Sequence, residues 1–412
     1  MRIVEPGTLP PIGIIPEYMY AQVLRQNRYG EPKNAFQIEE IKIPEIKEDE
    51  VLIAVMSAGL NYNSVWAAKA YPLDMIDLMQ KRGDSTDDFQ ILGSDCSGII
   101  YKVGSKVKDV KVGDEIVVQG GWHDKNEEHN LKGGDPTVSR SFRAWGYETN
   151  YGSYAQFCIV KDFQCLPKPK HLSWDEAAVY MVSGVTAYRM LNHYSPHTVK
   201  KGDVVLIWGA SGGLGSMAIQ LVKNAGAIPV GVVNSEVKRQ FCQNMGALAL
   251  IRSDYEHWGP LLSEELKPEN QQIWREKAKT FVKDLLKLTE GRYPNIVLEH
   301  TGEDTFPTSL YVCDKEGMVV TCAGTSGYLG SFDLRYLWLY NKRIQGSHYA
   351  NPEECITFNN MVKDKSVSPV LSGSTSFSRL PLALQDMSEN KHLPGSMAVS
   401  YTHLTLPTSD LV

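Results

Sequence analysis

The first 180 residues alternate short apolar runs with turn-forming residues. The stretches "VLIAVMSAG" (51–59), "SGIIYKV" (97–103) and "GDEIVV" (113–118) are rich in β-branched residues, and glycine, aspartate or asparagine breaks the chain between them. Such short runs bounded by turn residues are typical of β-strands. The pattern predicts a compact, largely antiparallel β-barrel over residues 1–180.

The period of the pattern changes from about residue 181. The stretch "VVLIWGASGGLGSMAIQLVKNAGAIPVGVVNS" (204–235) predicts a strand, a glycine loop, a helix and a second strand, and "PNIVLEHTG" and "GMVVTCAGTSG" continue the alternation. Alternating strands and helices indicate a parallel, doubly wound sheet. We therefore expect an α/β protein with a second domain over residues 181–349, and we expect residues 350–398 to return and complete the first.

A charged insertion interrupts the second domain at residues 254–290. Residues 271–288 predict a long amphipathic helix with many charges. A solvated surface helix, a contact between subunits and a wall of a substrate site are all compatible with this pattern.

Composition excludes several classes of protein. Hydrophobic residues make up 42% and charged residues 22% of the chain, as in a globular enzyme. The net charge of −6 disfavours nucleic-acid binding, which usually needs a basic face. No apolar run is long enough for a membrane helix, and the first residues do not have the layout of a secretory signal, so we expect a cytoplasmic protein. The seven cysteines form no CxxC pair, so we expect no bound metal.

The glycine loop after "VVLIW" is the strongest chemical signal in the chain. Glycines there allow a tight turn and let the backbone approach a pyrophosphate, and the helix that follows offers free N–H groups to that anion. The residues expected to bind a dinucleotide are Gly209, Ser211, Gly212, Gly213, Leu214 and Gly215.

The end of the second strand indicates which dinucleotide binds. Sites that prefer NAD usually carry an acidic residue there, which binds the ribose 2′-hydroxyl. This chain instead has Ser235, Lys238 and Arg239, which can bind and neutralise a 2′-phosphate. The sequence therefore predicts NADPH.

Several long motifs give the chain a family resemblance. The stretches "GLNYNSVW", "AWGYETNYGSYAQF", "LPKPKHLSWDEAA", "TAYRML", "VLEHTGEDTFPTS" and "KRIQGSHYAN" resemble crotonyl-CoA carboxylase/reductases, from about residue 20 to residue 398. That family belongs to the zinc-free branch of the medium-chain dehydrogenase/reductase superfamily. The resemblance implies a GroES-like β-barrel catalytic domain and a Rossmann domain that binds NADPH.

The resemblance also implies a reaction. NADPH reduces C3 of an α,β-unsaturated acyl-CoA, and the resulting enolate attacks CO2 at C2, as in the conversion of crotonyl-CoA to ethylmalonyl-CoA. When a proton takes the place of CO2, the product is the saturated thioester. The family is typically tetrameric, so a homotetramer is expected.

Four residues match the family's CO2 pocket. The amide of Asn63 is expected to donate to a CO2 oxygen, while Glu148 and His348 are expected to hold a water molecule that also donates to CO2. Tyr147 takes the place of a phenylalanine, and its additional hydroxyl leaves open the ratio of carboxylation to simple reduction.

Three further residues are assigned, one by its position and two from the family resemblance. Thr186 precedes the glycine loop and is expected to contact the nicotinamide or its ribose. Comparison with the family suggests that Lys315 and Arg335 bind the phosphates of CoA. Ordinary solvated surface charge is the alternative interpretation for these two cations.

Two other functions remain compatible with the motifs. A pure enoyl-CoA or acryloyl-CoA reductase would share the cofactor site but need not keep the asparagine, glutamate and histidine set. A crystallin-like protein that binds NADPH without catalysis is a more remote alternative.

The chain ends on an unusual stretch, "VSYTHLTLPTSDLV" (399–412). Its codons can be written as the read-through of a sequencing-library adapter. We therefore expect residues 399–412 to be an artefact that replaces the native end of the chain.

Overall fold

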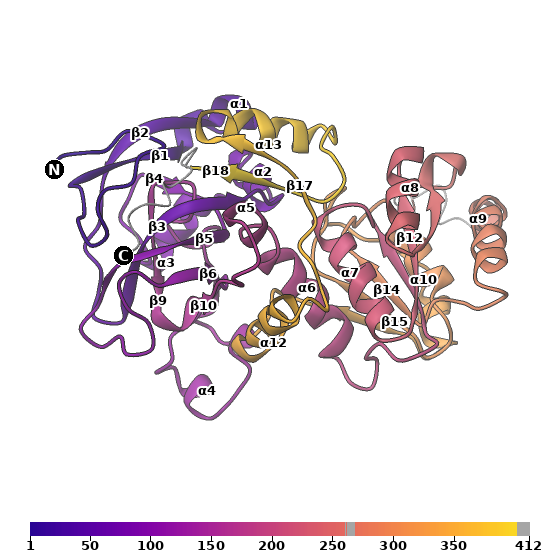
Figure 1. Cartoon of the computed structure of the whole chain (residues 1–412). Helices are drawn as coiled ribbons and strands as arrows, with labels where there is room; N and C mark the ends of the chain where they lie inside the picture. Colours follow the sequence, from indigo (N-terminus) through magenta and orange to yellow (C-terminus); the bar gives the residue numbers. More distant parts are fainter. Residues whose placement is uncertain (260, 262–267, 402–412) are drawn as a thin grey trace. The chain divides into compact units, whose positions relative to one another are not determined.

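The computed structural model describes residues 1–259, 261 and 268–401 (Figure 1). The chain divides into two compact units. The mixed-sheet unit comprises residues 1–182, 351–365 and 369 onward. The parallel-sheet unit comprises residues 183–350 and 366–368.

The mixed-sheet unit is built on three sheets. The largest has the strand order β10-β6-β5-β3-β18-β17, and β9 also pairs with β3. Its strands are β3 (Glu50–Gly59), β5 (Asp95–Val103), β6 (Glu115–Val118), β9 (Phe157–Lys161), β10 (Cys165–Pro167), β17 (Leu371–Ser376) and β18 (Ser396–Ser400). The smaller sheets contain β1 (Tyr18–Arg25), β2 (Phe36–Lys42) and β4 (Phe89–Ile91), and β7 (Gly121–Trp122) and β8 (Arg143–Ala144).

The last strands of the chain join the first. In Figure 1 the yellow strands β17 and β18 lie in the same sheet as the purple strand β3, and β18 pairs with β3 in antiparallel register. β17 and β18, which lie outside the residues 1–180 for which an antiparallel barrel was predicted, are parallel to each other. The reason is that the helix α13 (Leu380–Ser388) connects them, and a helical crossover is how two parallel strands are joined.

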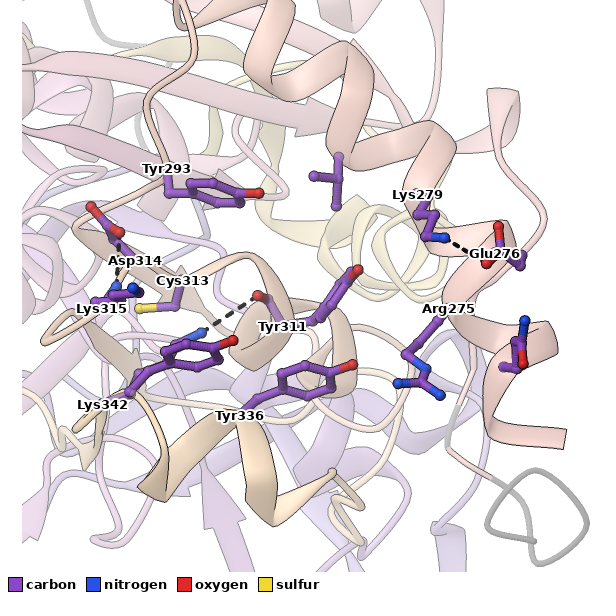
Figure 2. A pocket seen from close by; sticks show the side chains of 13 residues that line it. Arg275, Glu276, Lys279, Tyr293, Tyr311, Cys313, Asp314, Lys315, Tyr336 and Lys342 are labelled. Atoms are coloured by element: carbon purple, nitrogen blue, oxygen red, sulfur yellow. Dashed lines mark hydrogen bonds and ion pairs between the residues drawn. The ribbon is translucent and has the colours of Figure 1, made fainter. Parts of the chain in front are cut away.

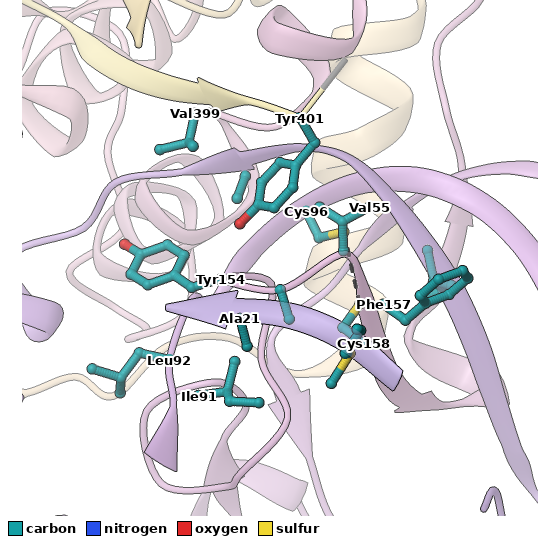
Figure 3. Packing of buried hydrophobic residues seen from close by; sticks show 14 of the residues in the cluster. Ala21, Val55, Ile91, Leu92, Cys96, Tyr154, Phe157, Cys158, Val399 and Tyr401 are labelled. Atoms are coloured by element: carbon teal, nitrogen blue, oxygen red, sulfur yellow. Dashed lines mark hydrogen bonds between the residues drawn. The ribbon is translucent and has the colours of Figure 1, made fainter. Parts of the chain in front are cut away.

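The apolar faces of these strands form one continuous core, part of which is shown in Figure 3. Tyr154 and Phe157 are fully or almost fully buried there, and the Tyr101 ring meets the Phe157 ring edge-on with 5.5 Å between centroids. Val399 is also buried in this core. The side chains of β18 therefore help to hold the sheet together.

The mixed-sheet unit also contains helices between its strands. They are α1 (Pro32–Ala35), α2 (Asn63–Ala68), α3 (Met75–Arg82), α4 (Glu128–Leu131), α5 (Trp174–Ala177) and α12 (Pro352–Lys363). Helix α3 was not apparent from the strand-like pattern, although its ends follow local rules. Asp74 accepts a hydrogen bond from the Asp77 N–H at the first turn, and Gly83 ends the helix with φ of 75°.

The parallel-sheet unit contains a six-stranded sheet in the order β13-β12-β11-β14-β15-β16, and every neighbouring pair is parallel. This is the doubly wound Rossmann order, 3-2-1-4-5-6. The strands are β11 (Val204–Trp208), β12 (Ile228–Val233), β13 (Leu248–Ile251), β14 (Ile296–Glu299), β15 (Met318–Thr321) and β16 (Arg343–Gly346). The helices are α6 (Met181–Asn192, which begins in the mixed-sheet unit), α7 (Gly213–Asn224), α8 (Glu236–Asn244), α9 (Pro268–Leu288), α10 (Phe306–Val312) and α11 (Leu334–Trp338).

The charged insertion forms the long helix that its pattern predicts, α9. Trp274, Ala278, Phe281 and Leu285 recur every three to four positions and are buried, so one face of the helix packs on the unit's core. The other face carries charges. The insertion is therefore a structural part of this unit as well as a charged surface.

Most of the expected artefact, residues 402–412, lies outside the described residues. Val399 and Ser400 complete β18, and Tyr401 is buried, with its hydroxyl donating to the Ser153 carbonyl at 2.8 Å. The foreign origin of residues 399–412 stays a prediction, which resequencing of the gene would test. No helix among the described residues is long and apolar enough to span a membrane.

Candidate active site

The glycine loop lies where the strand order of the parallel sheet reverses, between β11 and its two neighbours, β12 and β14. Gly209 follows β11 with φ of 55°, and α7 begins at Gly213. A Cβ on Gly215 would lie 2.4 Å from the Ala210 Cα, so only glycine allows the loop and the helix to pack this closely. The predicted loop residues thus form the turn and helix start that a pyrophosphate requires.

The end of β14 completes the crevice beside this loop. The ring of His300 forms a hydrogen bond through Nε2 with the Trp208 carbonyl at 2.8 Å, and a Cβ on Gly209 would lie 2.7 Å from the same nitrogen. His300 was not among the predicted site residues. Its position directly after a buried strand of a doubly wound sheet was the available signal.

Glu299, also at the end of β14, is fully buried. Its carboxylate accepts hydrogen bonds from the Thr301 and Gly302 N–H groups, the Thr305 hydroxyl and the Ser309 hydroxyl, the last at 2.5 Å. Burial raises the pKa of Glu299, and these donors partly oppose that rise. The residue shapes the loop that follows β14, and it was also missed.

The residues expected to bind a 2′-phosphate lie at the start of α8. Ser235 is the N-cap, and its hydroxyl accepts from the Lys238 N–H at 3.4 Å. Burial lowers the pKa of Lys238. Arg239 forms an ion pair with Glu236 at 2.7 Å, so a phosphate would have to compete for its guanidinium. Thr186 is buried on α6.

In the mixed-sheet unit, Asn63 is the first residue of α2, and its side-chain amide donates to the Ser94 hydroxyl at 3.0 Å. Gly93 has φ of 104°, and a Cβ on Gly146 would lie 2.0 Å from the Gly93 carbonyl oxygen. The "AWGYE" turn therefore packs backbone against backbone on the segment that fixes Asn63. This brings the Asn63 and Glu148 motifs together within one unit.

Glu148 is held by two partners. Its Oε2 accepts from the Ala144 N–H at 2.9 Å, and its Oε1 lies 3.6 Å from Nη1 of Arg82. The carboxylate is mostly buried, with 17% of the side chain exposed. Tyr147 is partly buried against the core, and its carbonyl accepts from the Gln90 side-chain amide at 2.6 Å. Residues 66–90 carry no motif that assigns them to the site, so Arg82 and Gln90 were missed.

A buried acid lies next to Ser94. Asp95 accepts from the Asn61 side-chain amide at 2.9 Å and from the Val182 N–H at 2.8 Å. Burial raises the pKa of Asp95 to about 6, although both hydrogen bonds oppose the shift. Through Asn61, this network fixes the segment just before Asn63.

His348, the remaining predicted member of the CO2 pocket, belongs to the parallel-sheet unit. It follows the edge strand β16 and is exposed. The structure therefore places Asn63, Tyr147 and Glu148 in one unit and His348 in the other, and the roles of all four stay predictions.

A pocket of about 590 Å³ opens in the parallel-sheet unit (Figure 2). Four cationic side chains and four tyrosines line it, together with two carboxylates, Glu276 and Asp314. The cations are Arg275, Lys279, Lys315 and Lys342; the tyrosines are Tyr293, Tyr311, Tyr336 and Tyr340. Figure 2 shows Arg275 extending from α9 beside the Tyr336 ring, whereas Lys279 pairs with Glu276 on the same helix. Such a lining suits a planar base and its phosphates.

Of the two residues predicted to bind CoA, one lines this pocket and the other does not. Lys315 lines it, and its ammonium lies 5.5 Å from the centre of the Tyr340 ring. Arg335 is on α11 and forms a two-pronged ion pair with Asp333. Arg335 is not among the lining residues, although its neighbour Tyr336 is.

No group of three or more histidine, cysteine or acidic side chains in the described part of the chain is arranged to hold a metal ion. All seven cysteines, which lie in that part, are free thiols. Burial raises the pKa of several, including Cys313 to about 12, so they are poor nucleophiles at neutral pH.

Comparisons with known proteins agree with this architecture. Residues 47–170 match the alcohol dehydrogenase GroES-like domain, and residues 213–364 match the zinc-binding dehydrogenase family. The chain is 44% identical to the crotonyl-CoA carboxylase/reductase of Cereibacter sphaeroides over 96% of this chain and 90% of that protein.

Solved structures give the same result. The crotonyl-CoA carboxylase/reductase AntE in complex with NADP is 45% identical, with a TM-score of 0.92 over 98% of this chain and 99% of that chain. The 2-octenoyl-CoA carboxylase reductase CinF in complex with NADP and 2-octenoyl-CoA is 35% identical, with a TM-score of 0.87 over 96% and 91% of the two chains. The predicted GroES-like and Rossmann fold is confirmed, and the chain belongs to the crotonyl-CoA carboxylase/reductase family of the medium-chain dehydrogenase/reductase superfamily.

Proposed function

We propose that this protein catalyses the NADPH-dependent reductive carboxylation of a short α,β-unsaturated acyl-CoA, as in the conversion of crotonyl-CoA to ethylmalonyl-CoA. The observation that carries the proposal is the packing of the Gly146–Glu148 turn on the segment that fixes Asn63. A simple reductase has no need to hold an amide donor and a carboxylate together beside its acyl site.

The glycine loop fits NADPH, because a Cβ at Gly215 would close the space between loop and helix, and the N-terminus of α7 is free for a pyrophosphate. When bound, NADPH supplies the hydride for C3 of the substrate. Lys238 and Ser235 would bind the 2′-phosphate, and Thr186 would lie against the nicotinamide or its ribose. Membership of a family with NADP-bound structures supports this assignment.

Asn63 would orient CO2. Its amide has two N–H groups, and the Ser94 hydroxyl accepts one of them. The other N–H remains to donate to a CO2 oxygen, and a donor fixed in advance needs no reorganisation when charge develops on that oxygen.

Glu148 and His348 would hold the water that donates to the second oxygen. The Tyr147 hydroxyl would then decide how well water is kept from C2, because a proton that reaches the enolate first gives the saturated product. Replacing Tyr147 by phenylalanine therefore tests which of the two products the hydroxyl favours.

The cationic pocket would receive the nucleotide end of CoA. Lys315, Arg275 and Lys279 would neutralise its phosphates, while the tyrosine rings would contact the adenine. Arg335 already pairs with Asp333. It would therefore bind a CoA phosphate only if its guanidinium contacted both the phosphate and Asp333.

Product analysis tests the proposed function directly. Purified enzyme is incubated with NADPH and crotonyl-CoA, with and without bicarbonate and carbonic anhydrase, and the thioesters are separated by mass. We expect the carboxylated product to dominate at high CO2. Saturated acyl-CoA as the sole product at high CO2 would leave the enoyl-CoA reductase as the correct assignment.

We also propose the roles of the two units and the assembly. The mixed-sheet unit would be the substrate and catalytic domain, and the parallel-sheet unit would be the NADPH-binding domain. A homotetramer is supported by apolar side chains exposed on α11, since Leu334 and Trp338 are 61% and 65% exposed. Sedimentation velocity of the purified protein tests the assembly.

A further inference from the structure

Two segments of the mixed-sheet unit meet at the Glu148 turn. Residues 82–90 start with the last residue of α3, and residues 143–150 contain the Glu148 turn. The contacts between them include Arg82 to Glu148 at 3.6 Å, Asp84 to Arg143 at 2.9 Å, Gln90 to the Tyr147 carbonyl at 2.6 Å, and Asp87 to Asn150 at 2.8 Å.

Three of these contacts hold the backbone or flank the turn, whereas the Arg82 contact reaches the proposed functional group itself. One oxygen of Glu148 is bound by a backbone N–H, and the last torsion of a glutamate side chain is broad. A single hydrogen bond therefore leaves the carboxylate free to tilt. The guanidinium of Arg82 faces the other oxygen, so the two partners define the plane of the group.

Arg82 is itself well supported. Met75, Ile76 and Met79 anchor α3 in the interior, and the Gly83 cap fixes where the helix ends. The arginine therefore projects from a fixed point. Its side chain is 31% exposed, and partly exposed ion pairs add little to folding stability, so stability alone does not account for it.

We propose that Arg82 is a positioning residue for carboxylation, which rests on the proposed function. From the end of α3 it holds the Glu148 carboxylate in the orientation that captures CO2. Without it the carboxylate tilts, the water between Glu148 and CO2 loses its direction, and protonation at C2 gains over carboxylation. Hydride transfer to C3 does not depend on Arg82.

The test is the ratio of carboxylated to saturated product, measured together with the rate of NADPH oxidation. Arg82→Gln should lower the ratio about fivefold, the factor given by ~1 kcal/mol at 1.36 kcal/mol per factor of ten, and should leave the oxidation rate within about twofold. Arg82→Lys keeps the positive charge and should retain most of the ratio. Arg143→Gln breaks the neighbouring ion pair with Asp84 and should leave the ratio unchanged.

A double-mutant cycle shows whether Arg82 acts through Glu148. In the Glu148→Gln background, Arg82→Gln should cause no further fall in the ratio. An unchanged ratio in Arg82→Gln alone, or an equal fall in both backgrounds, would overturn the inference. Failure of the proposed function looks different, because wild-type enzyme would then form only the saturated thioester.

Discussion

The residues proposed to handle CO2 and those proposed to handle the phosphates of CoA are held in opposite ways. Around Asn63 and Glu148, glycine backbones touch and each functional group has fixed partners. In the cationic pocket, lysines and an arginine reach from separate elements into about 590 Å³ of space. A small neutral molecule offers few contacts, so its site needs rigid donors, whereas phosphates attract long cations across a distance.

The largest expected effect comes from disturbing the tightly packed turn at Gly146. Gly146→Ala adds a Cβ 2.0 Å from the Gly93 carbonyl, at a residue with φ of 68°. We expect the free energy of unfolding to fall by ~3 kcal/mol or more, from overpacking and backbone strain together. Gly113→Ala is the control, because its φ is 94° but no atom lies within 4 Å of the added Cβ. A loss of ~1 kcal/mol is expected there from strain alone. Urea unfolding of both variants measures the difference, and equal losses would contradict close packing at Gly146.

The next effect concerns chemistry at the same turn. Glu148→Ala removes the carboxylate that would orient water and CO2, so the ratio of carboxylated to saturated product should fall at least about tenfold while reduction continues in part. Product analysis under saturating CO2 provides the measurement. If carboxylation and reduction decline in equal proportion, Glu148 has a structural role and not the proposed one.

The third effect tests phosphate binding by a long cation. Lys238→Ala should raise the KM for NADPH about tenfold, because a charge-assisted contact to the 2′-phosphate is lost. The KM for NADH, which lacks that phosphate, should change little. Arg239→Ala should have a smaller effect, since Arg239 already pairs with Glu236. Steady-state kinetics with both nucleotides measure the two KM values. A parallel rise in both would refute the assignment of Lys238 to the 2′-phosphate.

The smallest expected effect tests whether the cationic pocket binds the phosphates of CoA. Lys315→Ala should raise the KM for crotonyl-CoA about fivefold, because several cations share the phosphates and each contributes modestly. Crotonyl-pantetheine, which lacks the nucleotide, serves as the matched substrate and should show no change. Equal effects on the two substrates would place Lys315 outside the CoA site.

Local sequence patterns predicted the parts of the fold that short-range physics controls. The glycine loop follows a buried strand and begins a helix, so residues 209–215 could be assigned in advance. The alternating strands and helices of residues 181–349 and the amphipathic residues of α9 were also predictable, because each pattern repeats within a few positions. Helix α3 was missed, since its eight residues lie between strand-like stretches and only Asp74 and Gly83 mark its ends.

Contacts between distant segments could not be predicted in this way. Nothing in the sequence pairs Arg82 with Glu148, which are 66 positions apart, or Gly93 with Gly146. These contacts depend on where α3 and the "AWGYE" turn lie after the sheets have formed. Likewise, Arg239 could be assigned to a phosphate from its position alone, and only the structure shows that Glu236 already occupies it.

By itself, the sequence determined the family resemblance, the dinucleotide loop and the succession of a β-rich and an alternating α/β region, because motifs and periodicities are properties of neighbouring residues. The tertiary structure decided which side chains support Asn63 and Glu148, that β17 and β18 run parallel beside β3, and that α9 and α11 border one cationic pocket. The physical reason is that these arrangements come from the packing of segments that are remote in the chain, and such packing leaves no local pattern.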